Sequence, residues 1–246
     1  MYSPSTRPLL IALAAMLVTA APSSAGPFGD FAQKAYDATR RANAGVSDGD
    51  IGAALKEALA QGANNAITQL GRSDGFWQNT RFRIPLPKAL TKADPLLRSF
   101  GAGPRLDELH LSMNRAAEAA VPVAAEVFSG AIRQLSLKDV RAILDGPPDA
   151  ATSFFRQATS TSLQAKFRPI VAGITAKAGL AQQYKAVLAS AGPLATTLGA
   201  PDLDSWVTDR ALNSLFLRVA DEEKAIRENP AARSTELLKK VFAKGG

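Results

Sequence analysis

The sequence contains no cysteine, and this absence excludes several kinds of chemistry. A chain without thiols forms no disulfide, offers no thiolate to a metal and has no thiol nucleophile. It also lacks the cysteine on which a bacterial lipoprotein carries its lipid. We therefore expect core packing alone to hold the folded protein together.

Histidine is almost as scarce, because His110 is the single one among 246 residues. Carboxylate metal sites in helical bundles use Glu-x-x-His pairs from more than one helix, so one histidine cannot complete that pattern. The sequence also lacks H-E-x-x-H and a glycine-rich phosphate loop. We predict no metal site, no cofactor and no catalytic residue.

Long apolar runs are missing except near the start, where Leu9–Ala20 forms a run of twelve residues. A helix that spans a bilayer needs about 20 apolar residues, so this run is too short. Small residues follow it, and we predict a signal peptide over residues 1–25 that is cleaved after Ala25, with an uncleaved anchor as the alternative. We expect an exported, periplasmic protein with no transmembrane segment in the mature chain.

The charge balance favours cations, with a formal net charge of +7 and a pI of about 9.8. Removing residues 1–25 takes away Arg7 and no acid, which leaves +6. Such a charge suits an acidic envelope protein or an anionic lipid surface, and export argues against nucleic acid as a partner. A role of the charge in solubility alone is the alternative.

The rest of the chain predicts an all-α protein. Two capping boxes, Ser47 with Asp50 and Ser136 with Asp139, mark helix starts. Asp149 and Asp202 are the predicted caps of two later helices. After a partly helical lead-in over 26–46, we predict a single domain over 47–244 with about eight to ten packed helices. The predicted helices cover 48–70, 88–100, 105–120, 122–134, 137–144, 150–158, 161–178, 180–189, 203–228 and 235–244.

Two of these segments carry open alternatives. Pro95 either kinks the helix predicted over 88–100 or starts a new one after Asp94. The helix at 235–244 has a lysine-rich side and an apolar side. We favour its docking on the body of the protein, with an anionic membrane surface as the alternative.

One short extended connector near residues 75–87 interrupts the helical pattern, with the sequence GFWQNTRFRIPLP. We expect Phe76 or Trp77 to plug the core, and apolar residues of the second half to face inward. Arg81 and Arg83 would then point outward together. With Trp77 they are candidates for contact with an anionic partner. An aromatic and basic clamp for single-stranded nucleic acid is the disfavoured alternative.

A polar stripe marks the helix predicted over 105–120, where His110, Asn114 and Glu118 follow one another at four-residue spacing. Arg115 is placed to pair with Glu118. A structural hydrogen-bond network is the favoured interpretation of this stripe. Asn114, Arg115 and Glu118 are also candidates for ligand or partner contact, and general acid–base catalysis around His110 and Glu118 is the alternative.

Several segments together resemble the domain of unknown function 4197 family of bacteria. They are LKEALAQGANNAITQLG at 55–71, DGFWQNTRFRIPLPKAL at 74–90, LSMNRAAEAAVPVAAEVFSGAI at 111–132, LDGPPDAATSFFR at 144–156, FRPIV at 167–171 and ENPAARSTELLKKVF at 228–242. The runs at 114–118 and 84–87 are its most specific marks. Pro95 departs from the pattern, and His110 is not one of its defining residues.

The resemblance implies an exported, mostly helical protein and brings no activity, cofactor or catalytic residue. We expect a binding or scaffold protein for a lipid or amphipathic ligand, or for a protein partner in the envelope. An enzyme that uses the stripe around His110–Glu118 is the alternative, and a purely structural envelope protein is a third possibility.

Overall fold

The computed structural model describes residues 47–177, 179–190 and 201–228. The chain divides into two compact units, Met1–Gly45 and Val46–Gly246, and every described residue belongs to the second. The predicted signal peptide, the lead-in and the helix at 235–244 lie outside the described residues. Within the described ranges the structure contains helices and no strand, which confirms the all-α class.

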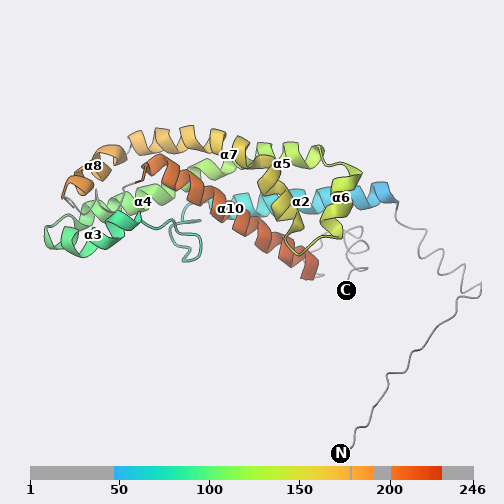
Figure 1. The fold of residues 1–246 in the computed structure, drawn as a ribbon, viewed down its shortest axis with the longest axis horizontal. Helices are drawn as coiled ribbons and strands as arrows, with labels where there is room; N and C mark the ends of the chain where they lie inside the picture. Colours follow the sequence, from blue (N-terminus) through green and yellow to red (C-terminus); the bar gives the residue numbers. More distant parts are fainter. Residues whose placement is uncertain (1–46, 178, 191–200, 229–246) are drawn as a thin grey trace, which may run out of the picture. The chain divides into compact units, whose positions relative to one another are not determined.

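From α3 to α8 the helices follow one another with short connections, whereas a longer loop joins α2 to α3 (Figure 1). Their bounds are α2 Asp48–Gly71, α3 Lys88–Ser99, α4 Gly103–Ala120, the 3-10 turn η1 Val121–Val123, α5 Ala124–Arg133, α6 Leu137–Leu144, α7 Ala150–Lys177, α8 Leu180–Ser190 and α10 Leu203–Glu228. Among the described residues, no helix has the length and apolar character that crossing a membrane requires.

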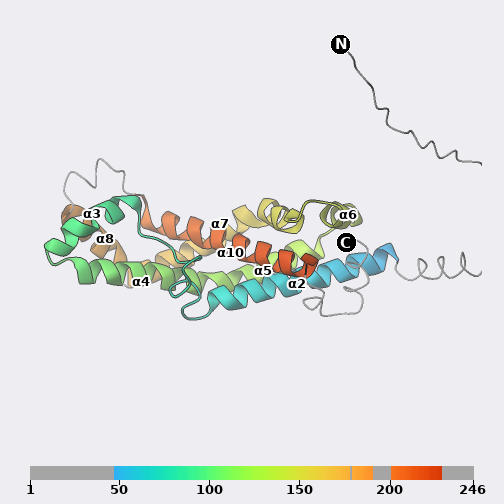
Figure 2. The same ribbon diagram turned by 90° about the horizontal axis from the view of Figure 1, so that it is seen from below.

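Helices α7 and α10 form the most extensive contact between two helices of the described part of the chain. Helix α10 packs next most extensively against α2, while α4 packs against α7 and against α10 (Figures 1 and 2). The core between these helices is built on phenylalanines, and Phe128 lies against both Phe155 and Phe216 with ring centroids 5.1 and 6.0 Å away. On α4, apolar residues recur at three- and four-residue spacing, which predicts one buried side, and all of them are buried: Leu106, Leu109, Met113, Ala116, Ala117 and Ala120.

The predicted caps are confirmed at several helix starts. Ser47 with Asp50 and Ser136 with Asp139 form complete capping boxes. Their backbone and hydroxyl hydrogen bonds lower the pKa of both aspartates. At α10, the Oδ1 atom of Asp202 accepts a hydrogen bond of 2.8 Å from the backbone N–H of Ser205. These starts can be predicted because each cap is local in sequence.

Helix α7 corrects the sequence prediction, because one helix runs where we expected a break near Ser160. The hydroxyl of Thr159 donates a 2.6 Å hydrogen bond to the carbonyl of Phe155 four residues earlier, and Ser160 makes the same bond to Arg156. Hydroxyls that bond back to the preceding turn are satisfied inside a helix. They therefore do not end it.

The start of α7 is capped by another helix. The carboxylate of Glu223 on α10 accepts hydrogen bonds from the backbone N–H groups of Ala151 and Thr152 at 3.0 and 2.9 Å. It also accepts one from the Thr152 hydroxyl at 2.8 Å, and Arg227 donates to it from one turn away. We expected Asp149 to supply this cap, because it directly precedes the helix in the sequence. The residue that satisfies these donors lies about 70 positions later, where a local pattern cannot indicate it.

Pro95 neither ends nor restarts a helix, since α3 runs through it from Lys88 to Ser99. Its side chain lies on the exposed side of α3. The carbonyl that loses its helical partner to Pro95 belongs to Thr91, four residues earlier, which is also exposed. Pro122, by contrast, lies in the 3-10 turn η1, which separates α4 from α5.

Candidate binding site on the 72–87 loop

Residues 72–87, which we call the latched loop, connect α2 to α3. The loop turns back sharply on the end of α2. A Cβ atom at Gly75 would lie 2.4 Å from the carbonyl oxygen of Leu70 and 2.6 Å from that of Gln69, so only glycine allows this approach. Asp74 takes a left-handed conformation with φ of 66° just before it.

The connector prediction holds in outline. Phe76, Phe82 and Ile84 are buried and Leu86 packs against the core, while residues 83–87 run without helix or strand pairing. Arg81 and Arg83 are exposed as expected, but each already has a partner. Arg81 forms a 2.7 Å ion pair with Asp221 of α10. Arg83 stacks on Trp77 and donates to its carbonyl oxygen.

Asn114 on α4 holds the second half of the loop by its backbone. Its Oδ1 accepts a 2.8 Å hydrogen bond from the N–H of Ile84, and its Nδ2 donates to the carbonyl oxygen of Ile84 at 3.1 Å. A further hydrogen bond runs from Nδ2 to the carbonyl of His110 at 2.9 Å. The Asn114 side chain is fully buried, so the side-chain amide replaces the pairing that a neighbouring strand would supply.

Glu118, one turn further along α4, holds the first half of the loop. Its Oε1 accepts hydrogen bonds from the backbone N–H groups of Phe76 and Trp77 at 3.0 and 3.1 Å. Its Oε2 pairs with Arg115 at 2.7 Å, as the spacing predicted. Only 4% of Glu118 is exposed, and a buried carboxylate is stable when its charge and lone pairs are met in this way.

Arg115 extends this network to the turn that precedes Gly75. It donates to the carboxylate of Asp74 and, at 3.0 Å, to the hydroxyl of Ser73. The hydrogen bond to Glu118 is the largest cause of a raised pKa for Arg115, so the guanidinium stays charged at every accessible pH. One arginine therefore links helix α4 to two neighbouring residues of the tight turn.

His110 completes the contacts from α4. Its Nε2 lies 2.9 Å from the carbonyl oxygen of Ile84, which requires the tautomer with hydrogen on Nε2. The Trp77 ring meets the imidazole edge-on with centroids 5.0 Å apart. Burial lowers the pKa of His110, and the charge of nearby Arg83 acts in the same direction. A neutral histidine that donates to a carbonyl has a positioning role here.

Helix α10 holds the opposite side of the latched loop. The indole N–H of Trp206 donates to the carbonyl oxygen of Pro85 at 3.0 Å, and the hydroxyl of Ser214 reaches that of Phe82 at 3.5 Å. Together with the Arg81–Asp221 pair, these bonds fix the loop between α4 and α10. The two runs that carry the family resemblance, 84–87 and 114–118, therefore meet in space.

All six candidate residues from the sequence contact the latched loop or belong to it: Trp77, Arg81, Arg83, Asn114, Arg115 and Glu118. Five of these side chains hydrogen-bond to other groups of the chain, and the sixth, Trp77, packs its ring against His110 and Arg83. None of them lines the hollow that lies on the other side of the turn. The polar stripe on α4 thus holds the loop in place, while other residues of the loop, α2 and α10 line the pocket.

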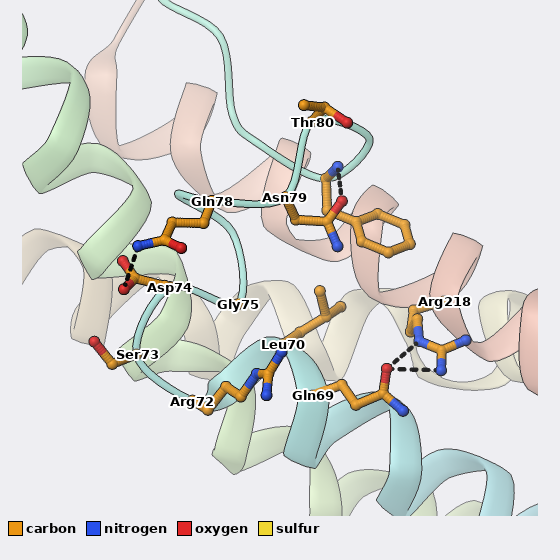
Figure 3. A pocket seen from close by; sticks show the side chains of 11 residues that line it. Gln69, Leu70, Arg72, Ser73, Asp74, Gly75, Gln78, Asn79, Thr80 and Arg218 are labelled. Carbon is orange, nitrogen blue, oxygen red and sulfur yellow. Dashed lines mark hydrogen bonds between the residues drawn. The ribbon is translucent and has the colours of Figure 1, made fainter.

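That hollow is a pocket of about 580 Å³ between the turn, the end of α2 and α10 (Figure 3). Its lining is mostly polar and includes Gln69, Arg72, Ser73, Gln78, Thr80 and Arg218. Figure 3 shows Thr80 and Asn79 above the pocket, with Gln69 and Arg218 at its side. The ring of Phe82 contributes an apolar part of the wall.

The charges in the pocket differ in how far they are neutralised. Arg218 donates to Gln69 at 2.8 Å and pairs with Glu222 and Asp221. Asp74 pairs with Arg115 and also accepts from Gln78 at 2.9 Å. The Arg72 side chain is exposed and has no ion pair or hydrogen bond within the described part of the chain. Arg72 is thus the cation available to a ligand.

Sequence reasoning missed this pocket, although one signal was present. The run Gly71–Gly75 reads GRSDG and matches the G-x-S-x-G pattern of serine hydrolases. That pattern needs a strand before the serine and a helix after it, whereas here a helix precedes a turn. Ser73 accepts its bond from Arg115, and the imidazole of His110 is bonded to Ile84 instead. The run marks the tight turn that forms the pocket wall.

The described residues around this site do not form a cluster of metal ligands. Across residues 47–177, 179–190 and 201–228, no group of three His, Asp or Glu side chains is placed to hold a metal ion. Asp107, the acid one turn before His110, bonds to Arg98 at 2.6 Å, and that bond lowers its pKa.

Comparison with known proteins agrees with the resemblance seen in the sequence. A model of the family described as "Protein of unknown function (DUF4197)" matches residues 45–243. Searches of curated proteins and of solved structures found no match. The matched range contains the whole latched loop and both helices that hold it. The chain therefore belongs to the DUF4197 family.

Proposed function

We propose that this protein is an exported, periplasmic binding protein, and that its ligand is a small polar molecule with an anionic group. The observation that carries the proposal is the polar pocket of about 580 Å³ beside the latched loop. Pockets of a few hundred Å³ with a small number of placed polar groups are the usual form of a small-molecule site. The guanidinium of Arg72, which has no partner within the described ranges, supplies the anion contact.

The rigidity of the loop supports recognition. Asn114 and Glu118 are buried polar groups that each make two hydrogen bonds to loop backbone, and fully satisfied buried networks hold one conformation. A loop held in advance loses little conformational freedom on binding, which favours affinity. The polar side chains of Ser73, Gln78 and Thr80 therefore reach a ligand from fixed backbone positions.

The lining changes the class of ligand that we favour. From the sequence we expected a lipid or amphipathic ligand, but an acyl chain needs an apolar pocket, and this lining is mostly polar. The catalytic alternative gains no support either. Glu118 already accepts three hydrogen bonds, and a general base needs a free lone pair directed at its substrate.

Native mass spectrometry of the protein purified from its own envelope fraction tests the proposal. We expect a fraction of molecules to carry a small bound compound, and an intact mass that lacks residues 1–25. Arg72→Glu should lose the compound because it reverses the charge at the pocket. The control is Lys138→Glu, which makes a similar charge change on α6 outside the pocket lining.

Two results would count against the proposal. A wild-type spectrum that shows only the unliganded protein would contradict the proposal that a small molecule is bound. Retention of the same compound in Arg72→Glu would show that the pocket is not where it binds. An intact mass that still includes the first 25 residues would contradict the cleaved signal peptide.

A further inference from the structure

Helix α3 presents an apolar patch to solvent. Its inner face is buried through Ala89, Leu90, Ala93 and Leu97. Its outer face carries Pro95 and Leu96, and Phe100 follows at the turn into α4. Phe100 is 74% exposed and Leu96 is 44% exposed, which are large values for apolar side chains. An exposed apolar patch with a polar rim marks an interaction surface.

The charges around this patch are mainly positive. Lys88 and Lys92 on α3 and Arg105 on α4 are exposed and form no ion pair within the described part of the chain. Arg98 is shared between Asp94 and Asp107, at 2.6 Å from each. Arg98 therefore neutralises part of the charge of these two acids. Glu108 on α4 is an exposed acid that forms no ion pair among the described residues.

Helix α8 adds to the same end of the unit. It packs against α3 and α4, and the three helices lie together in both ribbon views (Figures 1 and 2). Its sequence, LAQQYKAVLAS, contains Lys185 and no acid. Lys185 is exposed. The apolar patch is thus bordered by helices with more free cations than free acids.

We propose that this surface, made of Leu96, Phe100 and the cations Lys88, Lys92 and Arg105, docks on an anionic lipid surface. Phe100 and Leu96 enter the boundary between headgroups and acyl chains, and the cations contact the phosphates. Aromatic and aliphatic side chains flanked by Lys and Arg are the usual composition of a membrane-surface contact. The negative phosphates of the lipid attract these cations. A second copy of the same surface carries the same positive charges and would be repelled.

This proposal is independent of the ligand pocket. The pocket lies at the end of α2 beside α10, and its lining includes no residue of α3 or α8. The proposed membrane surface and the pocket lining therefore share no residue. Failure of one proposal therefore leaves the other standing.

Co-sedimentation with vesicles tests the docking. The full-length mature protein is mixed with vesicles that contain phosphatidylglycerol and, separately, with vesicles of phosphatidylcholine alone. We expect binding to the anionic vesicles that weakens as salt is added. Phe100→Ser should lower the affinity about tenfold, because a Phe ring leaves the membrane boundary. Lys92→Glu should also lower it about tenfold, because it reverses one charge near the lipid surface.

Leu137→Ser is the matched control, since Leu137 on α6 is 56% exposed and lies outside the proposed surface. It should leave the affinity unchanged within about twofold, as expected for an exposed residue away from the contact. Circular dichroism checks that all three variants fold. A Phe100→Trp variant gives a second readout, because its fluorescence should shift to the blue on anionic vesicles.

Several outcomes would overturn the proposal. Absence of binding to the anionic vesicles would do so, as would equal binding to phosphatidylcholine. Unchanged binding of Phe100→Ser would place any membrane contact elsewhere in the chain. A wild-type dimer in light scattering that Phe100→Ser converts to a monomer would assign the patch to self-association instead.

Discussion

Replacing Asn114 by alanine tests whether the latched loop depends on its clamp. The N–H of Ile84 has Asn114 Oδ1 as its partner, so the change leaves this buried donor unsatisfied. An unsatisfied buried group costs about 1–3 kcal/mol, and the lost side-chain atoms leave a small cavity. The Ile84 carbonyl keeps its bond to His110 at 2.9 Å, which limits the cost. We expect a loss of about 2–4 kcal/mol in the free energy of unfolding.

Urea denaturation measures this loss, and Asn64→Ala is the matched control. Asn64 lies on α2 with an exposed side chain, so the same chemical change there should stay within about 0.5 kcal/mol. Hydrogen exchange adds a local readout, because the Ile84 amide should exchange faster in Asn114→Ala. A loss that equals the control within about 0.5 kcal/mol, with Ile84 still protected, would refute the clamp.

Two further predictions test the turn and the histidine. Gly75→Ala should destabilise the protein by about 1–3 kcal/mol, because its Cβ would meet the Leu70 carbonyl. In the control Gly173→Ala, the new Cβ meets nothing within 4 Å, so this change in α7 should stabilise slightly. Thermal melts measure both effects, and an unchanged melting temperature for Gly75→Ala would contradict the close approach. Burial lowers the pKa of His110, so the unfolded chain takes up its proton at higher pH than the folded one. Stability should therefore be full above the ordinary value of 6.5 and fall as pH decreases through it, with Arg83 adding to the effect and Asp107 opposing it. His110→Gln should make this fall shallower in urea titrations across that pH range, and an unchanged slope would show that His110 does not titrate differently on folding.

The all-α class and most helix bounds could be predicted because their causes are local. A capping box involves residues three positions apart, and an apolar stripe repeats within one helix. Ser47, Ser136 and Asp202 therefore mark true helix starts from their sequence context alone. The error near Ser160 has the same origin, since a local cap signal cannot show that the hydroxyls bond back into their own helix.

The candidate site shows the limit of local patterns. The spacing on α4 indicated that Asn114, Arg115 and Glu118 share a side of one helix, and that Arg115 pairs with Glu118. It did not indicate what that side faces. The partners of Asn114 and Glu118 are backbone groups 30 and 42 residues earlier, and nothing in their side chains signals the pairing.

The sequence by itself determined most of the helices, their local caps, the extended loop and the family, because each depends on patterns within a few residues or on overall likeness. Only the tertiary structure decided that α4 and α10 hold the loop from two sides, that Glu223 caps α7, and that the outward face is a polar pocket. The physical reason is that a buried hydrogen bond must be satisfied by whatever group the packing brings near. Packing brings together residues that are far apart along the chain.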